Sequence, residues 1–244
     1  MAHFPAIMPN NKPIAARQAL ARLIHGNKRF VRKRRSGNSP SQKNSEWFAV
    51  KPRGPFAIIL SCSDSRAPSE ILFDQGLGDL FVIRVAGNIV APSQVGSVEF
   101  AAATTKAQLV IVMGHTECGA IQVTLDAIAG KESVPAENIQ SIVGRIRPHI
   151  EGLVMRSKRS RAKHEVVWRE SVRANVVAST DHLRHASRFL EELVREGKLA
   201  IVGAEYCLET GLVDFFDNPF DKPVAKKRVP AGKRVLAKKR RSKS

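Results

Sequence analysis

The sequence predicts an α/β fold: a mostly parallel central sheet of four strands plus a short closing strand, flanked by helices, with an N-terminal helical arm. Two observations favour this class. Short, uninterrupted apolar runs are typical of strands buried on both faces, and segments with apolar residues at helical spacing separate them. This alternation supplies the crossover connections that parallel strands require. The 244 residues are enough for one such domain with a substantial core.

The N-terminal part is predicted to be an irregular stretch followed by a helix. Residues 1–12 carry no regular pattern, whereas apolar residues recur at helical spacing over 13–35, where a break is expected near Gly26. Pro13 suits the first turn of a helix. A Ser/Gly/Asn/Pro cluster at 36–41 predicts a linker, so we assign residues 1–40 to a helical arm.

The remaining elements define an α/β catalytic domain over residues 41–221. Strands are predicted at 56–60, 80–85, 109–113 and 199–206, with the short closing strand at 212–216. Helices are predicted at 68–73, 92–105, 119–129, 138–155, 164–178 and 183–195. A basic surface loop is predicted to join two of these helices at 156–163.

The positive charge of the chain is concentrated at its C-terminal end. Residues 222–244 contain eleven Lys and Arg and no acidic residue. The other 29 basic residues face 22 acidic ones, so only +7 of the formal charge of +18 belongs to the rest of the chain. We expect 222–244 to be a disordered basic tail. Such a tail could bind nucleic acid or an acidic surface, or serve only to keep the protein dissolved.

Composition also indicates the compartment. No apolar stretch reaches the length of a membrane span, and the first ten residues lack the charged-then-apolar pattern of an export signal. Three cysteines are too few for a disulfide framework. We therefore expect a cytoplasmic protein without a membrane partner.

Two polar segments follow two of the predicted strands. Cys62-Ser-Asp-Ser-Arg66 comes after the strand at 56–60, and His115-Thr-Glu-Cys118 comes after the strand at 109–113. The carboxyl ends of parallel strands meet at the edge where α/β proteins place their ligands. Cys, His and Cys are typical zinc ligands, and three protein ligands leave a fourth position for water, as in catalytic sites. The segments predict a zinc hydrolase or hydratase site.

Two other interpretations of the first segment fit the spacing less well. A phosphatase-type loop would place arginine six positions after the cysteine, whereas Arg66 stands four positions after Cys62. A structural zinc site would require four protein ligands in close pairs. Its fourth ligand here would have to be the distant Cys207 or a carboxylate.

The two segments, with the second extended to Gly119, resemble the zinc-site signatures of the β-class carbonic anhydrases. Further stretches that resemble this family lie at 73–81, 84–88, 96–100 and 196–203, so the resemblance covers roughly 14–216. It implies reversible hydration of carbon dioxide to bicarbonate and a proton, with one Zn²⁺ per subunit. It also implies a homo-oligomer, a dimer at least, whose site lies at the subunit interface. The helix at 13–35, expected to have few core partners in its own chain, would then lie on the neighbouring subunit.

Position by position, the resemblance implies that Cys62, His115 and Cys118 bind the zinc ion. Asp64 and Arg66 match the catalytic pair of the family. Arg66 would hold Asp64, and Asp64 would accept a hydrogen bond from the hydroxide that attacks carbon dioxide. In some members the aspartate instead binds zinc as a fourth ligand and closes the site.

Two residues are expected to contact the substrate. Gln75 matches a glutamine that in the family donates a hydrogen bond to a bicarbonate oxygen. The amide of Gly119 is expected to face developing negative charge, because it stands at the start of a predicted helix.

Two alternative functions stay open at this point. The same scaffold occurs in enzymes that act on carbonyl sulfide or carbon disulfide, and the shape of the pocket decides between these substrates. The protein could instead be a binding protein that engages nucleic acid or an acidic partner through its basic tail, with the zinc site serving only its structure.

Overall fold

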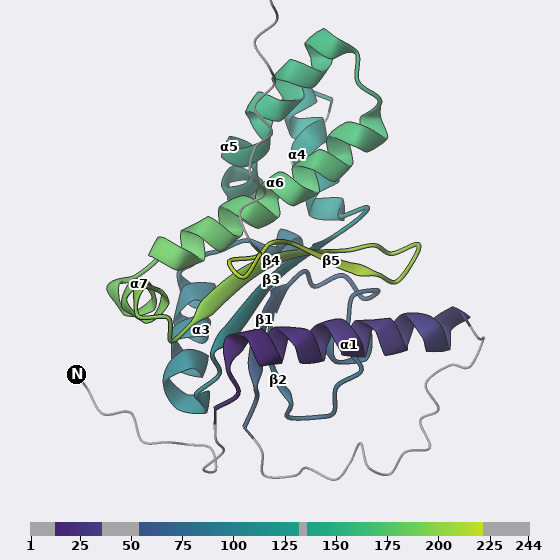
Figure 1. Ribbon diagram of the computed structural model, residues 1–244. Helices are drawn as coiled ribbons and strands as arrows, with labels where there is room; N and C mark the ends of the chain where they lie inside the picture. The colour runs from purple at the N-terminus through teal and green to yellow at the C-terminus, as the bar shows by residue number, and fades with distance from the viewer. Residues whose placement is uncertain (1–12, 36–53, 132–135, 222–244) are drawn as a thin grey trace, which may run out of the picture.

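The computed structural model describes residues 13–35, 54–131 and 136–221, which form a five-stranded sheet with helices on both faces (Figure 1). The strands are β1 (Ala57–Ser61), β2 (Leu80–Arg84), β3 (Leu109–His115), β4 (Ala200–Tyr206) and β5 (Val213–Asp217). In the sheet order β2-β1-β3-β4-β5, the first four strands are parallel and β5 runs antiparallel to β4. The predicted sheet of four parallel strands and a closing strand is confirmed.

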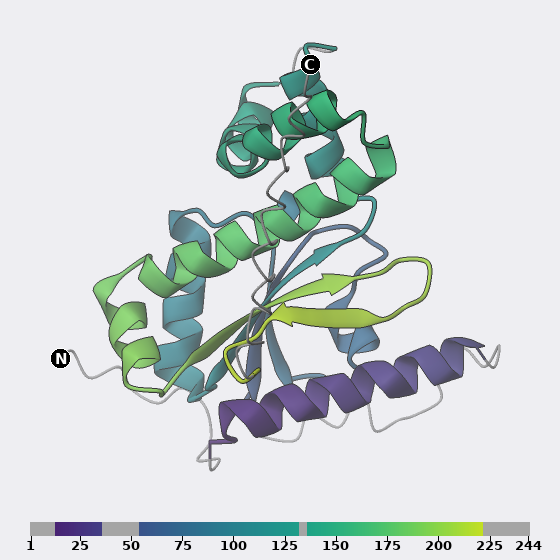
Figure 2. The ribbon, with the colours of Figure 1, turned by 45° about the horizontal axis from the view of Figure 1, so that its top comes forward.

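One face of the sheet is covered by α1 (Ala16–Arg35) and α2 (Ser69–Leu72). Figure 2 shows α1 running along this face. Ala19, Leu20 and Leu23 of α1 are no more than 4% exposed and pack into the core of their own chain. The expectation that this helix has few core partners of its own was therefore wrong. The break expected near Gly26 was also wrong, because α1 continues through that residue.

The opposite face is covered by α3 (Pro92–Thr105), α6 (His164–His185) and α7 (Arg188–Arg195). The 3₁₀ turn η2 (Ala86–Asn88) follows β2. Helices α4 (Gly119–Ala129) and α5 (Glu137–Ser160) pack with the first part of α6 into a helical lobe. This lobe stands beyond the carboxyl end of β3 (Figure 1). Cys62 and Cys118 pack with this lobe, so the predicted metal ligands lie where the lobe meets the sheet.

Two predicted boundaries in this region were wrong. Helix α5 continues to Ser160, so the loop predicted at 156–163 is confined to the residues between Ser160 and His164. Helix α6 continues to His185 because Ser179, Thr180 and Leu183 are buried, and the last helix begins at Arg188 rather than at 183. The side chain of Ser187 marks that start by accepting a hydrogen bond from the Leu190 N–H at 3.3 Å.

Helix α1 passes very close to the turn after α2, and this contact requires glycine. A Cβ added at Gly26 would lie 1.7 Å from the carbonyl oxygen of Phe73. We expect Gly26→Ala to lower the free energy of unfolding by about 3 kcal/mol, because backbone has to move to relieve the overlap. Urea unfolding of the zinc-loaded protein at fixed concentration measures the change.

Gly96→Ala is the matched control for this substitution. Gly96 lies within α3, and nothing lies within 4 Å of a Cβ added there. Alanine should therefore stabilise the protein by about 1 kcal/mol through its higher helix propensity. Equal unfolding midpoints for the two variants would show that the close approach at Gly26 does not constrain α1.

None of the helices in the described ranges combines the length and the apolar character that a bilayer span needs. The domain boundary at residue 40, the linker at 36–41 and the tail at 222–244 lie outside the described residues. They stay predictions.

Candidate metal centre

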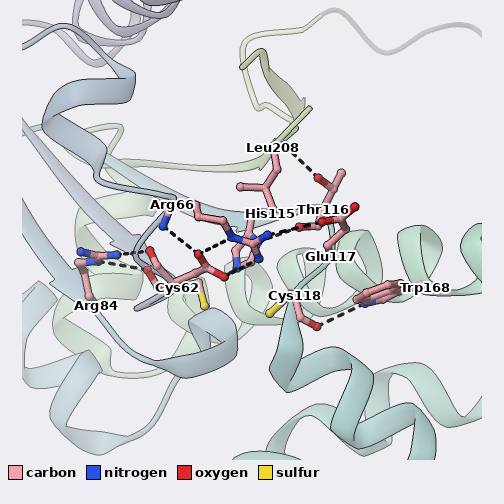
Figure 3. A network of polar contacts seen from close by, with 10 residues as sticks. Cys62, Arg66, Arg84, His115, Thr116, Glu117, Cys118, Trp168 and Leu208 are labelled. Carbon is pink, nitrogen blue, oxygen red and sulfur yellow. Dashed lines mark hydrogen bonds and ion pairs between the residues drawn. The ribbon is translucent and has the colours of Figure 1, made fainter. Parts of the chain in front are cut away.

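The pairing of the strands brings the two predicted segments together. Ser61 at the end of β1 pairs with Met113 of β3, so Cys62 and His115 follow that pair at nearly the same level of the sheet. Cys118 immediately precedes α4. A sulfur atom of each cysteine and a ring nitrogen of His115 all lie within 4.8 Å of one another. Figure 3 shows the two sulfur atoms directed into the same space beside the His115 ring.

The imidazole of His115 is held in the tautomer that a metal ligand needs. Its Nδ1 lies 2.8 Å from the carbonyl oxygen of Thr116, and because a carbonyl only accepts, Nδ1 carries the proton. The lone pair is therefore on Nε2, which is buried and has no hydrogen-bond partner among the described residues. A buried polar atom without a partner is costly, and coordination to a metal ion would satisfy it.

The two thiols are placed to act as thiolate ligands. Hydrogen bonding from the Cys118 thiol, assisted by His115, lowers the pKa of Cys62 to about 4 although burial opposes the shift. The pKa of Cys118 is raised because its thiol is hydrogen-bonded to Cys62 and buried. This pair therefore carries negative charge in a buried site, and a bound metal ion would replace the remaining proton. Two sulfurs and one imidazole nitrogen suit zinc, so these residues fit the ion.

Asp64 lies beside this group and is held by Arg66. The Arg66 side chain donates from Nε to Asp64 Oδ1 at 3.0 Å and from Nη2 to Oδ2 at 2.9 Å, and its backbone N–H donates to Oδ1 at 2.9 Å. These hydrogen bonds lower the pKa of Asp64 to about 2. Asp64 Oδ2 lies 3.9 Å from His115 Nε2. The site therefore contains a fixed, ionised carboxylate next to the three ligand atoms.

Two further side chains hold the backbone at and beside the ligand residues, and this role was not predicted for either of them. Arg84 at the end of β2 donates to the carbonyl oxygens of Cys62 at 3.2 Å and Asp64 at 2.5 Å. Trp168 of α6 donates from Nε1 to the carbonyl oxygen of Cys118 at 3.3 Å (Figure 3). Only the position of Arg84 at a neighbouring strand end could have indicated such a role in advance.

Arg84→Met tests this support. We expect the zinc affinity to fall about tenfold, since the loop that carries Cys62 loses two hydrogen bonds. Competition with a chromogenic chelator measures the affinity. Arg188→Met is the control, because Arg188 is 92% exposed on α7, where it pairs with Glu192. Equal affinity in the two variants would contradict the role of Arg84.

Of the two residues predicted to contact the substrate, Gly119 lies next to Cys118, whereas Gln75 belongs to a separate hydrogen-bond network. Gly119 is the first residue of α4, next to Cys118, and nothing lies within 4 Å of the position of its missing Cβ. Gln75 is buried in a different network, where Nε2 donates to the Phe73 carbonyl oxygen at 2.6 Å and Oε1 accepts from Arg22 Nε at 2.8 Å. No hydrogen bond among the described residues joins Gln75 to the three ligand residues.

An open cavity of about 420 Å³ reaches Arg66 from the side of α1. Arg66, which lines this cavity, also lies 3.5 Å from the carboxylate of Glu117. The other lining residues are Phe30, Tyr206, Leu208 and Glu209. The space gives a small molecule a route to the side of Arg66.

A buried Cys-His-Cys group at the carboxyl ends of parallel strands is typical of zinc proteins. The family model described as carbonic anhydrase matches residues 57–213. Carbonic anhydrase 2 of Mycobacterium tuberculosis is 36% identical over 204 residues, which cover 84% of this chain and 93% of that protein. The carbonic anhydrase of Mycolicibacterium smegmatis is 36% identical over 210 residues, covering 85% and 95%.

Solved β-carbonic anhydrases have the same fold as this chain. The β-carbonic anhydrase CcaA matches with a TM-score of 0.61 at 25% identity, over 82% of this chain and 92% of that one. A tetrameric β-carbonic anhydrase of Sordaria macrospora shares the fold with a TM-score of 0.61 at 17% identity, over 82% and 97%. The chain belongs to the β-class carbonic anhydrases, which are zinc enzymes.

Proposed function

We propose that the protein catalyses the reversible hydration of carbon dioxide to bicarbonate and a proton. The observation that carries this proposal is the buried group of Cys62, His115 and Cys118 with the ionised Asp64 beside it. This arrangement joins a site for one Lewis-acidic ion to a fixed hydrogen-bond acceptor, which is what the addition of water to carbon dioxide requires.

Cys62, His115 and Cys118 would hold one zinc ion per subunit. When bound, zinc supplies a Lewis acid that lowers the pKa of water and so makes a hydroxide nucleophile available near neutral pH. Two thiolates offset much of the charge of the ion, so the groups around the site matter more for positioning the nucleophile.

Asp64 would accept a hydrogen bond from the nucleophile and turn one of its lone pairs toward carbon dioxide. Arg66 donates three hydrogen bonds to the carboxylate and so holds it in one orientation. Because the carboxylate stays ionised, it accepts a hydrogen bond and does not donate one. Binding of Asp64 to the ion would compete with this role.

The amide of Gly119, at the positive end of α4, would face the negative charge that develops on the substrate oxygens. Gln75 is engaged by Arg22 and Phe73 within its own chain. The resemblance to the family implies a site at a subunit interface, where Gln75 would reach bicarbonate bound by the neighbouring subunit. We accordingly propose a homo-oligomer, a dimer at least.

We also propose that the enzyme works in the cytoplasm. All three cysteines are unpaired, and two of them belong to the metal centre, where a reducing environment keeps them available. A nucleic-acid partner for residues 222–244 gains no support from the comparisons or from the described residues.

Stopped-flow measurement of carbon dioxide hydration by the zinc-loaded protein tests the proposal. We expect saturable hydration well above the buffer rate, and slower turnover of carbonyl sulfide measured in parallel. Absence of hydration by protein that contains one zinc per chain would refute the assignment. Faster turnover of carbonyl sulfide would favour the alternative hydrolase.

A further inference from the structure

A second cavity, of about 220 Å³, lies between α5 and α6 and shares no lining residue with the metal centre. Asn175 and Ser179 of α6 are buried in its wall, at 2% and 6% exposure. Arg145 and His149 of α5 and His182 of α6 surround it with groups that can be positively charged. The cavity is thus a partly enclosed space with hydrogen-bond donors on two helices.

The side chains that line this cavity can carry positive charge but not negative charge. Arg145, His149 and His182 are its titratable residues, and no acidic side chain lines it. Burial and the positive charge of His182 lower the pKa of His149. His182 is therefore close enough to oppose the protonation of His149, and a bound anion would relieve this repulsion.

Ser179 adds a hydroxyl group to the wall of the cavity. Its side chain is nine-tenths buried and lines the cavity, yet its hydroxyl forms no hydrogen bond within the described part of the chain. Serine hydroxyls in helices can bond the carbonyl one turn back, as Thr180 does with Val176 at 2.6 Å. The oxygen of this hydroxyl is not fully enclosed, so it is free to bond to water or to a ligand in the cavity.

We propose that this cavity binds a small oxyanion such as sulfate or inorganic phosphate. The guanidinium of Arg145 supplies a charge-assisted donor, the imidazoles of His149 and His182 donate when protonated, and the hydroxyl of Ser179 completes the set. A divalent metal ion fits less well, because the two imidazoles have no carboxylate beside them and a guanidinium faces the same space.

The wall of the cavity is connected to the metal centre by one loop. Ile89 and Val90 line the cavity and directly follow η2. Asn175 donates from Nδ2 to the carbonyl oxygen of Gly87 at 2.8 Å, and Ile89 packs in one buried cluster with Cys62 and Cys118. We therefore expect occupation of the cavity to change the rate of carbon dioxide hydration; this consequence, unlike the binding itself, rests on the proposed function.

Titration of the zinc-loaded protein with sulfate, followed through the ring signals of His149 and His182 by NMR, tests the site. Sulfate keeps its charge between pH 6 and 8, so we expect tighter binding at pH 6, where more imidazole is protonated. Arg145→Met should weaken binding about tenfold or more. Arg147→Met is the matched control, because Arg147 is exposed on the same helix and pairs with Glu151 at 2.9 Å.

Several results would overturn the proposal. These are the absence of saturable shifts with both sulfate and phosphate, equal weakening by Arg147→Met, or a response of the two rings to nickel ions but not to oxyanions. If Arg145→Met does not fold, Ser179→Ala is measured in its place. We expect this variant to bind sulfate severalfold more weakly than the native protein. Identical effects of sulfate on the hydration rates of the native protein and Arg145→Met would overturn the coupling and leave the binding site in place.

Discussion

Replacement of Cys62 by serine should remove both the zinc and the activity. The side chain of Cys62 is 6% exposed and provides one of the two sulfur ligands, and a serine hydroxyl does not ionise near neutral pH. Loss of an outer partner of a ligand costs up to about a hundredfold, so loss of the ligand itself should lower kcat/KM by more than about a hundredfold. Elemental analysis and stopped-flow hydration measure the two effects.

Cys207→Ser is the control for this substitution within the same chain. Cys207 is the one cysteine that lies outside the metal centre, and it is partly exposed just after β4. We expect this variant to keep one zinc per chain and the hydration rate of the native protein. Full zinc content and activity in Cys62→Ser would show that the Cys-His-Cys group does not hold the catalytic ion.

The grouping of Cys62, His115 and Cys118 could be predicted because it depends on topology. Cys62 and His115 stand at the ends of strands that read as buried and parallel, and such strands end at the same edge of a sheet. The hydrogen bonds of Arg84 and Trp168 to backbone carbonyl oxygens could not be predicted, beyond the place of Arg84 at a neighbouring strand end. They depend on which carbonyl oxygens remain free after the loops fold, and neither residue belongs to a metal-ligand pattern.

The packing of α1 shows a different limit. Its apolar spacing predicts one buried face but does not say whether that face lies on its own sheet or on another subunit. The structure places Leu20 and Leu23 in the core of their own chain. The boundaries of α6 were missed for a related reason, because burial of Thr180 and Leu183 against the sheet keeps this part of α6 helical although the intrinsic helix propensity of threonine is low.

The metal centre combines an apolar wall with a charged rim. Cys62 and Cys118 pack in a buried cluster with Ile89 and Ile121, whereas Asp64 and Arg66 stand at the more exposed side. Low polarity around the thiolates strengthens electrostatic interactions within the site. Orientation of the nucleophile would then depend on the charged rim, where Arg66 holds the carboxylate of Asp64.

Asp64→Asn should therefore abolish most of the activity while leaving the zinc in place. Because the pKa of Asp64 is lowered to about 2, the native side chain is a carboxylate throughout the working pH range, and the substitution removes a full charge without changing its shape. We expect kcat/KM to fall by about 10²–10³, the usual cost of losing one positioned hydrogen-bonding group in an active site. Zinc content should stay at one ion per chain, since the three ligand residues are unchanged.

Glu117→Gln separates this effect from a general loss of charge around Arg66. Glu117 is 64% exposed and lies 3.5 Å from Arg66, so its ion pair is a surface interaction. Surface pairs contribute at most about 1 kcal/mol, and the hydration rate should fall less than about fivefold. If Glu117→Gln is as damaging as Asp64→Asn, the position of Arg66 controls the rate. If Asp64→Asn keeps the native rate, the nucleophile is oriented without the carboxylate.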